Sequence, residues 1–388
     1  MKNYFKYAAF LLAGALFATG FTSCEESDDE IIPGELDAKE QAIRKFIIPY
    51  VDHTVVQTYH QMAEYAIQLS DACQKIQAAH ANGNLDIKLV EEAGDLWKKS
   101  RKYWEQSEAF LYGAAGDYNI DPHIDSWPLD KNAMMDLLED LRNGKEWNID
   151  NNGGYGLIGF HALEYMLFEL SEDGEKSLPH NINYKPEELK YTCIVAEDLM
   201  NQCVRLEAAW AGMENVSSRK QDILTEAELE PSINYGESMK NAGKGGSLYK
   251  NYKDAAEALV QGAIDICDEV GALKIGKPNT GSNEDDKNYI ESPYSLNSIT
   301  DFVDNIISIR NAYQGSVEGD ASISDYIRGL NAELDKSVIA QIQTAIDAIS
   351  AIPEPFAKHA TEAEASRAIQ ELDTLTGLLE QLTEELGK

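Results

Sequence analysis

The chain has 388 residues, of which 43% are hydrophobic, so it is long enough to bury the cores of two domains. Asp and Glu number 67 against 33 Lys and Arg, which gives a formal net charge of −34 at pH 7. This acidity argues against binding to nucleic acid, which would repel the chain. It is compatible with attracting cations, but a solvated acidic surface is the commoner reason for such a charge.

Residues 1–23 are predicted to be a lipoprotein signal peptide. Lys2 and Lys6 precede an apolar stretch, residues 7–21, that is too short to span a bilayer comfortably. Small residues lead to Cys24 in the sequence "FTSC", which resembles a bacterial lipobox with Phe21 in the usual place of Leu. We therefore expect acylation of Cys24 and a lipid-anchored protein of the cell envelope, held at the outer membrane on its periplasmic face or at the cell surface.

Residues 24–38 are predicted to be an acidic tether, because "EESDDEIIPGELD" is rich in carboxylates and contains a Pro-Gly pair. The remaining cysteines show no C-x-x-C spacing, so a zinc ribbon is not expected and free thiols are preferred. These cysteines are Cys73, Cys193, Cys203 and Cys267.

Helical periodicity dominates the rest of the chain and predicts an all-α fold. Pro49 is expected to break the first helix. Two similar helical-bundle domains, packed around an interface, are expected at residues 39–214 and 215–388. A weak sequence similarity between residues 107–120 and 309–323 favours a duplication. The predicted helices cover residues 38–80, 87–113, 130–143, 155–172, 186–213, 249–272, 296–315, 323–331, 334–352 and 362–386.

The apolar stretch "GLIGFHALEYMLFEL", residues 156–170, contains His161 and Glu164. Three residues apart on a helix, the two side chains point the same way and could bind one ion or ligand. A buried carboxylate needs a partner, a metal ion or a proton. From spacing alone, the simpler interpretation is that the two side chains satisfy each other, or backbone groups, in a core.

Four blocks of sequence resemble the imelysin family in their order along the chain. "GFHALE" resembles the family's G-x-H-x-x-E motif, with Gly159, His161 and Glu164 at the defined positions. The other three blocks are "YWEQSEAFLYG" at residues 103–113, "IDSWPLD" at 124–130 and "YSLNSITDFVDNIISIRNAYQG" at 294–315.

This resemblance implies two helical bundles with a site at their interface, in a secreted or lipid-anchored protein linked to iron uptake. It implies Gly159, His161 and Glu164 as motif residues, with Gly159 allowing close approach to the backbone. Within the matching blocks, Glu108, Asp125 and Asp130 are further candidate metal ligands, and Arg310 is a candidate ligand-binding residue. Iron or another divalent metal is the expected cargo, with an envelope transporter as a possible partner.

A metallopeptidase using His161 and Glu164 is the main alternative. The chain contains no H-E-x-x-H, and the inverted H-x-x-E-H fails because Tyr165 stands in the place of the second histidine. A binding protein for an organic or sugar-acid ligand is the other alternative, with Arg310 available for a carboxylate. We expect a non-catalytic binding protein, since a mixed histidine and carboxylate set suits iron or zinc.

Overall fold

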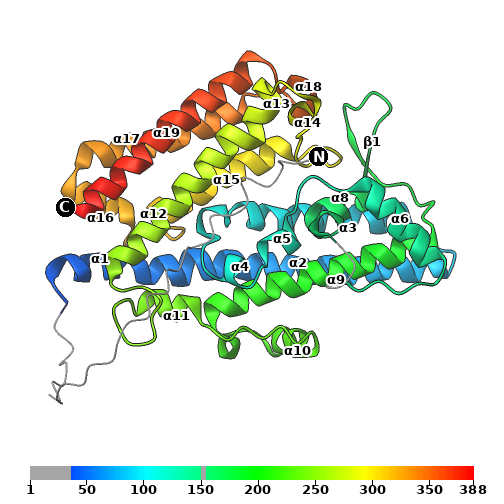
Figure 1. Ribbon diagram of the computed structural model, residues 1–388, viewed down its shortest axis with the longest axis horizontal. Coiled ribbons are helices and arrows are strands. Elements are labelled where there is room, and N and C mark those ends of the chain that lie inside the picture. The colour runs from blue at the N-terminus through cyan, green and yellow to red at the C-terminus, as the bar shows by residue number, and fades with distance from the viewer. Residues whose placement is uncertain (1–35, 150–153) are drawn as a thin grey trace, which may run out of the picture. The chain divides into compact units, whose positions relative to one another are not determined.

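The computed structural model describes residues 36–149 and 154–388. The predicted signal peptide, Cys24 and nearly all of the tether lie outside the described residues. Residues 37–388 form one compact unit, which is built almost entirely from helices (Figure 1). The only sheet among the described residues is an antiparallel pair, β1 (Phe168–Leu170) and β2 (Ser177–Pro179). The all-α prediction is confirmed.

A first group of helices is organised around the long helix α2 (Val56–Ala81), which packs against α3 (Ile87–Glu105) and α9 (Pro186–Ala211). Helix α2 buries residues at helical spacing, among them Tyr59, Met62 and Cys73, and these side chains face the core. Helices α6 (Lys131–Arg142) and α8 (Gly159–Leu167) pack on α9 and extend this group.

The predicted break at Pro49 is a change of helix type instead of an end. Helix α1 (Ala38–Pro49) continues directly into the π-helix η1 (Tyr50–Val55) and then into α2. At the end of η1 the N–H of Val56 donates to the carbonyl of Val51, five residues earlier. The wider π turns directly after the proline let the chain stay helical.

A second group consists of α12 (Tyr252–Asp268), α15 (Ser298–Gln314), α17 (Ala332–Ser350) and α19 (Ala363–Gly387), yellow-green to red in Figure 1. Helix α19 packs against both α17 and α12, and α15 packs against α17 and α12. Helix α12 runs on into a second π-helix, η5 (Glu269–Ile275).

The two groups meet where α15 packs on α3 and where α12 packs on the 3₁₀ turn η2 (Glu108–Phe110). Gly262 makes the second contact possible, because a Cβ there would lie 2.2 Å from the backbone oxygen of Ala109. Helices α10 (Ser218–Glu226) and α11 (Tyr235–Lys240) lie beyond residue 214 in sequence and pack on α9. The boundary between residues 214 and 215 stays a prediction.

Two predicted helices are shorter than expected. Helix α3 ends at Glu105, not near residue 113, and α8 ends at Leu167, where β1 begins. No helix among the described residues is long and apolar enough to cross a membrane. The four described cysteines are free, as expected. The remaining short helices are α4 (Ala114–Asp117), α5 (Asp121–Ile124), η3 (Tyr155–Leu157), η4 (Met213–Asn215), α13 (Gly276–Thr280), α14 (Glu284–Lys287), α16 (Ile323–Leu330) and α18 (Phe356–His359).

Candidate metal centre between the helical groups

Gly159 begins α8 with a φ of +77°, a conformation that favours glycine. A Cβ at this position would lie 2.3 Å from the backbone oxygen of Ile124 and 2.7 Å from that of His123. The end of α5 therefore presses directly on the start of α8. This contact confirms the close approach expected at Gly159, and it brings Asp125, the residue after α5, beside His161.

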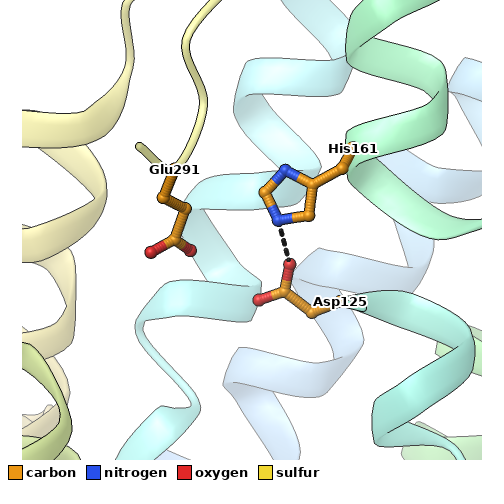
Figure 2. Close-up of side chains that lie close together, drawn as sticks. All are labelled: Asp125, His161 and Glu291. Atoms are coloured by element: carbon orange, nitrogen blue, oxygen red, sulfur yellow. Dashed lines mark ion pairs between the residues drawn. The ribbon is translucent and has the colours of Figure 1, made fainter. Parts of the chain in front are cut away.

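His161, Asp125 and Glu291 converge from three separate segments (Figure 2). The Nε2 atom of His161 lies 2.9 Å from Oδ1 of Asp125. Glu291 comes from the loop that precedes α15, and each of the three residues offers a ligand atom within 4.8 Å of the others. His161 and Glu291 are buried and Asp125 is nearly so, so this cluster is a mixed nitrogen and oxygen donor set in the interior.

Glu164 has a different set of partners. Its Oε1 accepts hydrogen bonds from the backbone N–H groups of Tyr294 (2.9 Å) and Ser295 (2.7 Å) and from the Ser295 hydroxyl (2.7 Å). Its Oε2 lies 3.9 Å from Nδ1 of His161 and has no hydrogen-bond partner among the described residues. Glu164 thus fastens α8 to the loop before α15, and the simple pairing of His161 with Glu164 accounts for little of its bonding.

Arg101, on α3, lies fully buried at the centre of the cluster. Its guanidinium contacts Asp125, and it lies 2.7 Å from Glu105, 2.5 Å from Glu291 and 3.4 Å from Asp301. Arg101 therefore joins α3 to segments of both groups, and it is the main buried cation of the interface.

Lys274, on η5, is the second buried cation. Its Nζ lies 3.3 Å from Glu291, 3.4 Å from Glu105 and 3.8 Å from Glu108. Around Arg101 and Lys274 stand six buried or nearly buried carboxylates, so acids exceed permanent cations by four. These carboxylates are Glu105, Glu108, Asp125, Glu164, Glu291 and Asp301.

The charges perturb one another strongly. Burial would lower the pKa of His161, but the neighbouring carboxylates of Asp125 and Glu164 outweigh it and raise the pKa to about 9. Burial would raise the pKa of Asp125, yet Arg101 and His161 hold it well below its usual range. Burial raises the pKa of Asp301 to about 6, against the opposing effect of Arg101. A pKa raised to about 9 favours the protonated form of His161 at neutral pH.

Two tryptophans line the same cluster. The indole N–H of Trp104 donates to Oδ2 of Asp125 at 2.7 Å, which fixes the orientation of that carboxylate. Trp127 belongs to the block "IDSWPLD" at residues 124–130, and the centroid of its ring lies 4.6 Å from that of the His161 ring.

The other residues suggested by the sequence take varied positions. Glu108 lies beside the cluster, with its ligand atom within 4.8 Å of those of Glu105 and Asp125. Asp130 is exposed and caps α6 by accepting from the N–H of Ala133 at 3.0 Å. Arg310 lies on α15 and is half-buried, near Asp304.

Sequence reasoning missed several residues of the cluster: Arg101, Glu105, Lys274, Glu291 and Asp301. Arg101 and Glu105 stand at i and i+4, which is the usual pattern of a solvated helix pair. The available signal was their position just before "SEAF": Glu105 lies inside the block at residues 103–113 that resembles the family, and Arg101 lies two residues before it.

Comparisons with known proteins agree with this architecture. The model of the imelysin family, peptidase family M75, matches residues 55–382. Iron-regulated protein A of Synechococcus elongatus is 29% identical over 314 residues, which cover 79% of this chain and 75% of that protein.

Two solved structures are also similar. One, from Parabacteroides distasonis and named as an iron-regulated protein A precursor, has a TM-score of 0.74 at 29% identity and covers 89% of this chain and 95% of its own. The other, an imelysin-like protein from Psychrobacter arcticum, has a TM-score of 0.63 at 12% identity, covers 90% and 96%, and shares the fold.

Proposed function

The chain belongs to the imelysin family, and from that premise we propose that it is an iron-related protein of the cell envelope that binds a metal ion, iron above all, between its two helical groups. The relative from Synechococcus elongatus carries iron regulation in its name, and this supports iron as the metal. Asp125, His161 and Glu291 would hold the ion, and the role is binding for uptake without hydrolysis.

The single observation that carries this proposal is the buried Asp125–His161–Glu291 cluster, set among carboxylates that outnumber the permanent cations by six to two. A buried excess of negative charge is costly unless protons or a cation neutralise it. One imidazole nitrogen with carboxylate oxygens is a donor set that suits iron. Arg101 contacts Oδ1 of Asp125 and Oε1 of Glu291. A carboxylate oxygen has two lone pairs, so Oδ2 of Asp125, which accepts from Trp104, and Oε2 of Glu291 can still help to bind an ion.

The unsatisfied atoms of the cluster also favour an ion. Oε2 of Glu164 and Nδ1 of His161 are buried and have no hydrogen-bond partner among the described residues. Because the cluster is closed over by protein, a bare ion fits it better than a bulky chelate or an organic ligand. Arg310 lies on α15 nine residues after Asp301, roughly 13 Å along the helix, so it does not belong to this cluster.

The peptidase alternative finds little support at Glu164. A catalytic glutamate of a metallopeptidase must take a proton from a water molecule in an open cleft. Glu164 is fully buried, and its Oε1 already accepts three hydrogen bonds. This arrangement suits a structural anchor for the motif better than a general base.

Metal binding can be tested by calorimetry with Fe²⁺ under anaerobic conditions. We expect the wild type to bind, and the double variant His161→Gln, Glu291→Gln to lose at least about 100-fold in affinity, since outer-shell partners of a metal alone account for about 10–100-fold. The matched control is His53→Gln, because His53 is 48% exposed and lies in an ion pair with Asp320.

Affinity should also fall as the pH is lowered below about 9, because the ion must displace the proton of His161. If the cluster only ties helices together, the double variant would lose stability by a few kcal/mol, and no site would be found in the wild type. Metal-dependent proteolysis by the wild type, lost in the variant, would establish the peptidase instead.

For the envelope location, the proposal depends on Cys24 and the signal peptide before it. We expect Cys24→Ala to yield soluble or unprocessed protein in cell fractionation, with Cys73→Ala, at a buried free thiol, as the matched control that stays membrane-bound. Membrane attachment and processing unchanged in Cys24→Ala would remove the lipid anchor from the proposal.

A further inference from the structure

A pocket of about 790 Å³ lies against α9, where residues 146–149 and 227–229 complete its wall. None of the six carboxylates around Arg101 and Lys274 is among the described residues that line it. Its volume falls in the range typical of sites for small molecules. The pocket is therefore a candidate binding site separate from the candidate metal centre.

Trp147 and Gln202 give this pocket two buried polar atoms that lack hydrogen-bond partners. Trp147 is 9% exposed and Gln202 is 4% exposed, and both residues line the pocket. Nε1 of Trp147 and Oε1 of Gln202 have no partner among the described residues. An indole N–H can only donate and an amide oxygen can only accept, so the first lacks an acceptor and the second lacks a donor. Buried groups left unpaired in this way are rare and costly, so the pair points to a ligand group that both donates and accepts.

Neighbouring side chains hold both unpaired groups in place. The ring of Trp147 stacks on that of Tyr191, with the ring centroids 5.7 Å apart. Nε2 of Gln202 lies 3.5 Å from Oδ1 of Asp198, whose Oδ2 lies 3.0 Å from Nδ1 of His123. Turning the amide of Gln202 round would set its oxygen against the carboxylate, so the oxygen stays the unpaired atom.

The chemistry of the wall selects among classes of ligand. Glu146, Glu197 and Asp198 line the pocket and none of the described lining residues is Lys or Arg, so an anion would be repelled. An ammonium group can only donate, so it would pair with the acids and with Gln202 but leave the indole N–H of Trp147 unpaired. A hydroxyl group donates and accepts, so it can satisfy Trp147 and Gln202 alike.

We propose that this pocket binds a neutral saccharide, either a free sugar or the end of a glycan chain. Trp147 donates to a sugar hydroxyl, Gln202 accepts from a hydroxyl, and the carboxylates of the wall accept from the others. Ile149, Ile194 and Leu229 line the same pocket and supply apolar surface for the C–H groups of the sugar ring. This site goes beyond the proposed metal binding, and neither proposal depends on the other.

The test is calorimetry of the folded chain with glucose, galactose, mannose and N-acetylglucosamine, and with trisaccharides of each, all at millimolar concentration. We expect the wild type to bind at least one of them, and tighter binding of a trisaccharide than of its monosaccharide would identify a glycan as the source. Trp147→Phe keeps the ring and removes the N–H, so it should weaken binding about fivefold to tenfold, the effect of one hydrogen bond. The matched control is Trp210→Phe, which should bind as the wild type does. Trp210 is also buried with an unpaired Nε1, but it does not line the pocket.

If Trp147→Phe does not fold, Glu197→Ala decides in its place, because Glu197 is an exposed residue of the wall and its loss should weaken binding of the same sugar. Affinity unchanged in the deciding variant would overturn the proposal, as would the absence of binding by any sugar of the set. Spermidine, which carries ammonium groups and no hydroxyl, should not bind in the pocket. Binding of spermidine that Trp147→Phe leaves intact, with no sugar bound, would show a site for organic cations instead.

Discussion

Gly159, His161 and Glu164 each do a different job within one turn of helix. Gly159 lets the backbone at the end of α5 approach closely, and this contact places Asp125 beside His161, 2.9 Å from its Nε2 atom. Glu164 accepts hydrogen bonds from the loop before α15. The G-x-H-x-x-E pattern therefore describes the meeting of three segments. Its glycine is required by geometry, since its φ is positive and backbone atoms occupy the space where a Cβ would stand.

Gly159→Ala tests this geometry. We expect it to lower the free energy of unfolding by roughly 2–4 kcal/mol, because the new methyl group collides with backbone oxygens that cannot rotate away, in addition to the cost of the left-handed conformation. Urea denaturation measures the loss.

The matched control is Gly83→Ala, at a φ of +69° with nothing within 4 Å of the added Cβ. It should cost only about 1 kcal/mol, the conformational part alone. Equal losses at the two positions would mean that the contact with α5 is unimportant.

The long helices could be predicted from the sequence, and their connections could not. The apolar repeat of α9 and of α19 follows the helical period closely, so both were located to within two residues. The end of α3 at Glu105 was missed, because "SEAF" continues the apolar period while the chain turns into η2. The hairpin of β1 and β2 was missed because three-residue strands carry too little pattern.

The candidate site, too, could be predicted from the sequence only in part. His161, Asp125 and Glu108 were found through blocks of sequence with a familiar order. Arg101 and Lys274 were not, because periodicity identifies the buried face of a helix and says nothing of what a charged residue meets on another helix. Lys274 lies on a π-helix, whose wider turn departs from the period on which the prediction depends.

At the scale of the whole molecule, buried protons couple stability to pH. The folded pKa of His161, about 9, exceeds the value of 6.5 expected in the unfolded chain. Its contribution is therefore fully present below pH 6.5 and is lost as the pH rises through 9. Asp301, with a pKa raised to about 6, acts with the same sign at lower pH, because the folded state again holds the extra proton.

We therefore expect the metal-free protein to melt at a lower temperature at pH 9 than at pH 6.5. His161 contributes on the order of 2–3 kcal/mol to the difference in unfolding free energy. Calorimetry across this range measures it, and His161→Gln should flatten the curve there. A wild type that is equally stable at pH 6.5 and pH 9 would show that the imidazole is not held protonated by Asp125 and Glu164.

Because the rings of Trp127 and His161 are in contact, the fluorescence of Trp127 should report on the protonation of His161. An imidazolium accepts an electron from an excited indole and quenches its emission, whereas a neutral imidazole does so weakly. Light emitted by Trp127 thus depends on whether His161 carries its proton. If a metal ion displaces that proton, as proposed above, its binding becomes visible in the chain's own fluorescence, without any added label.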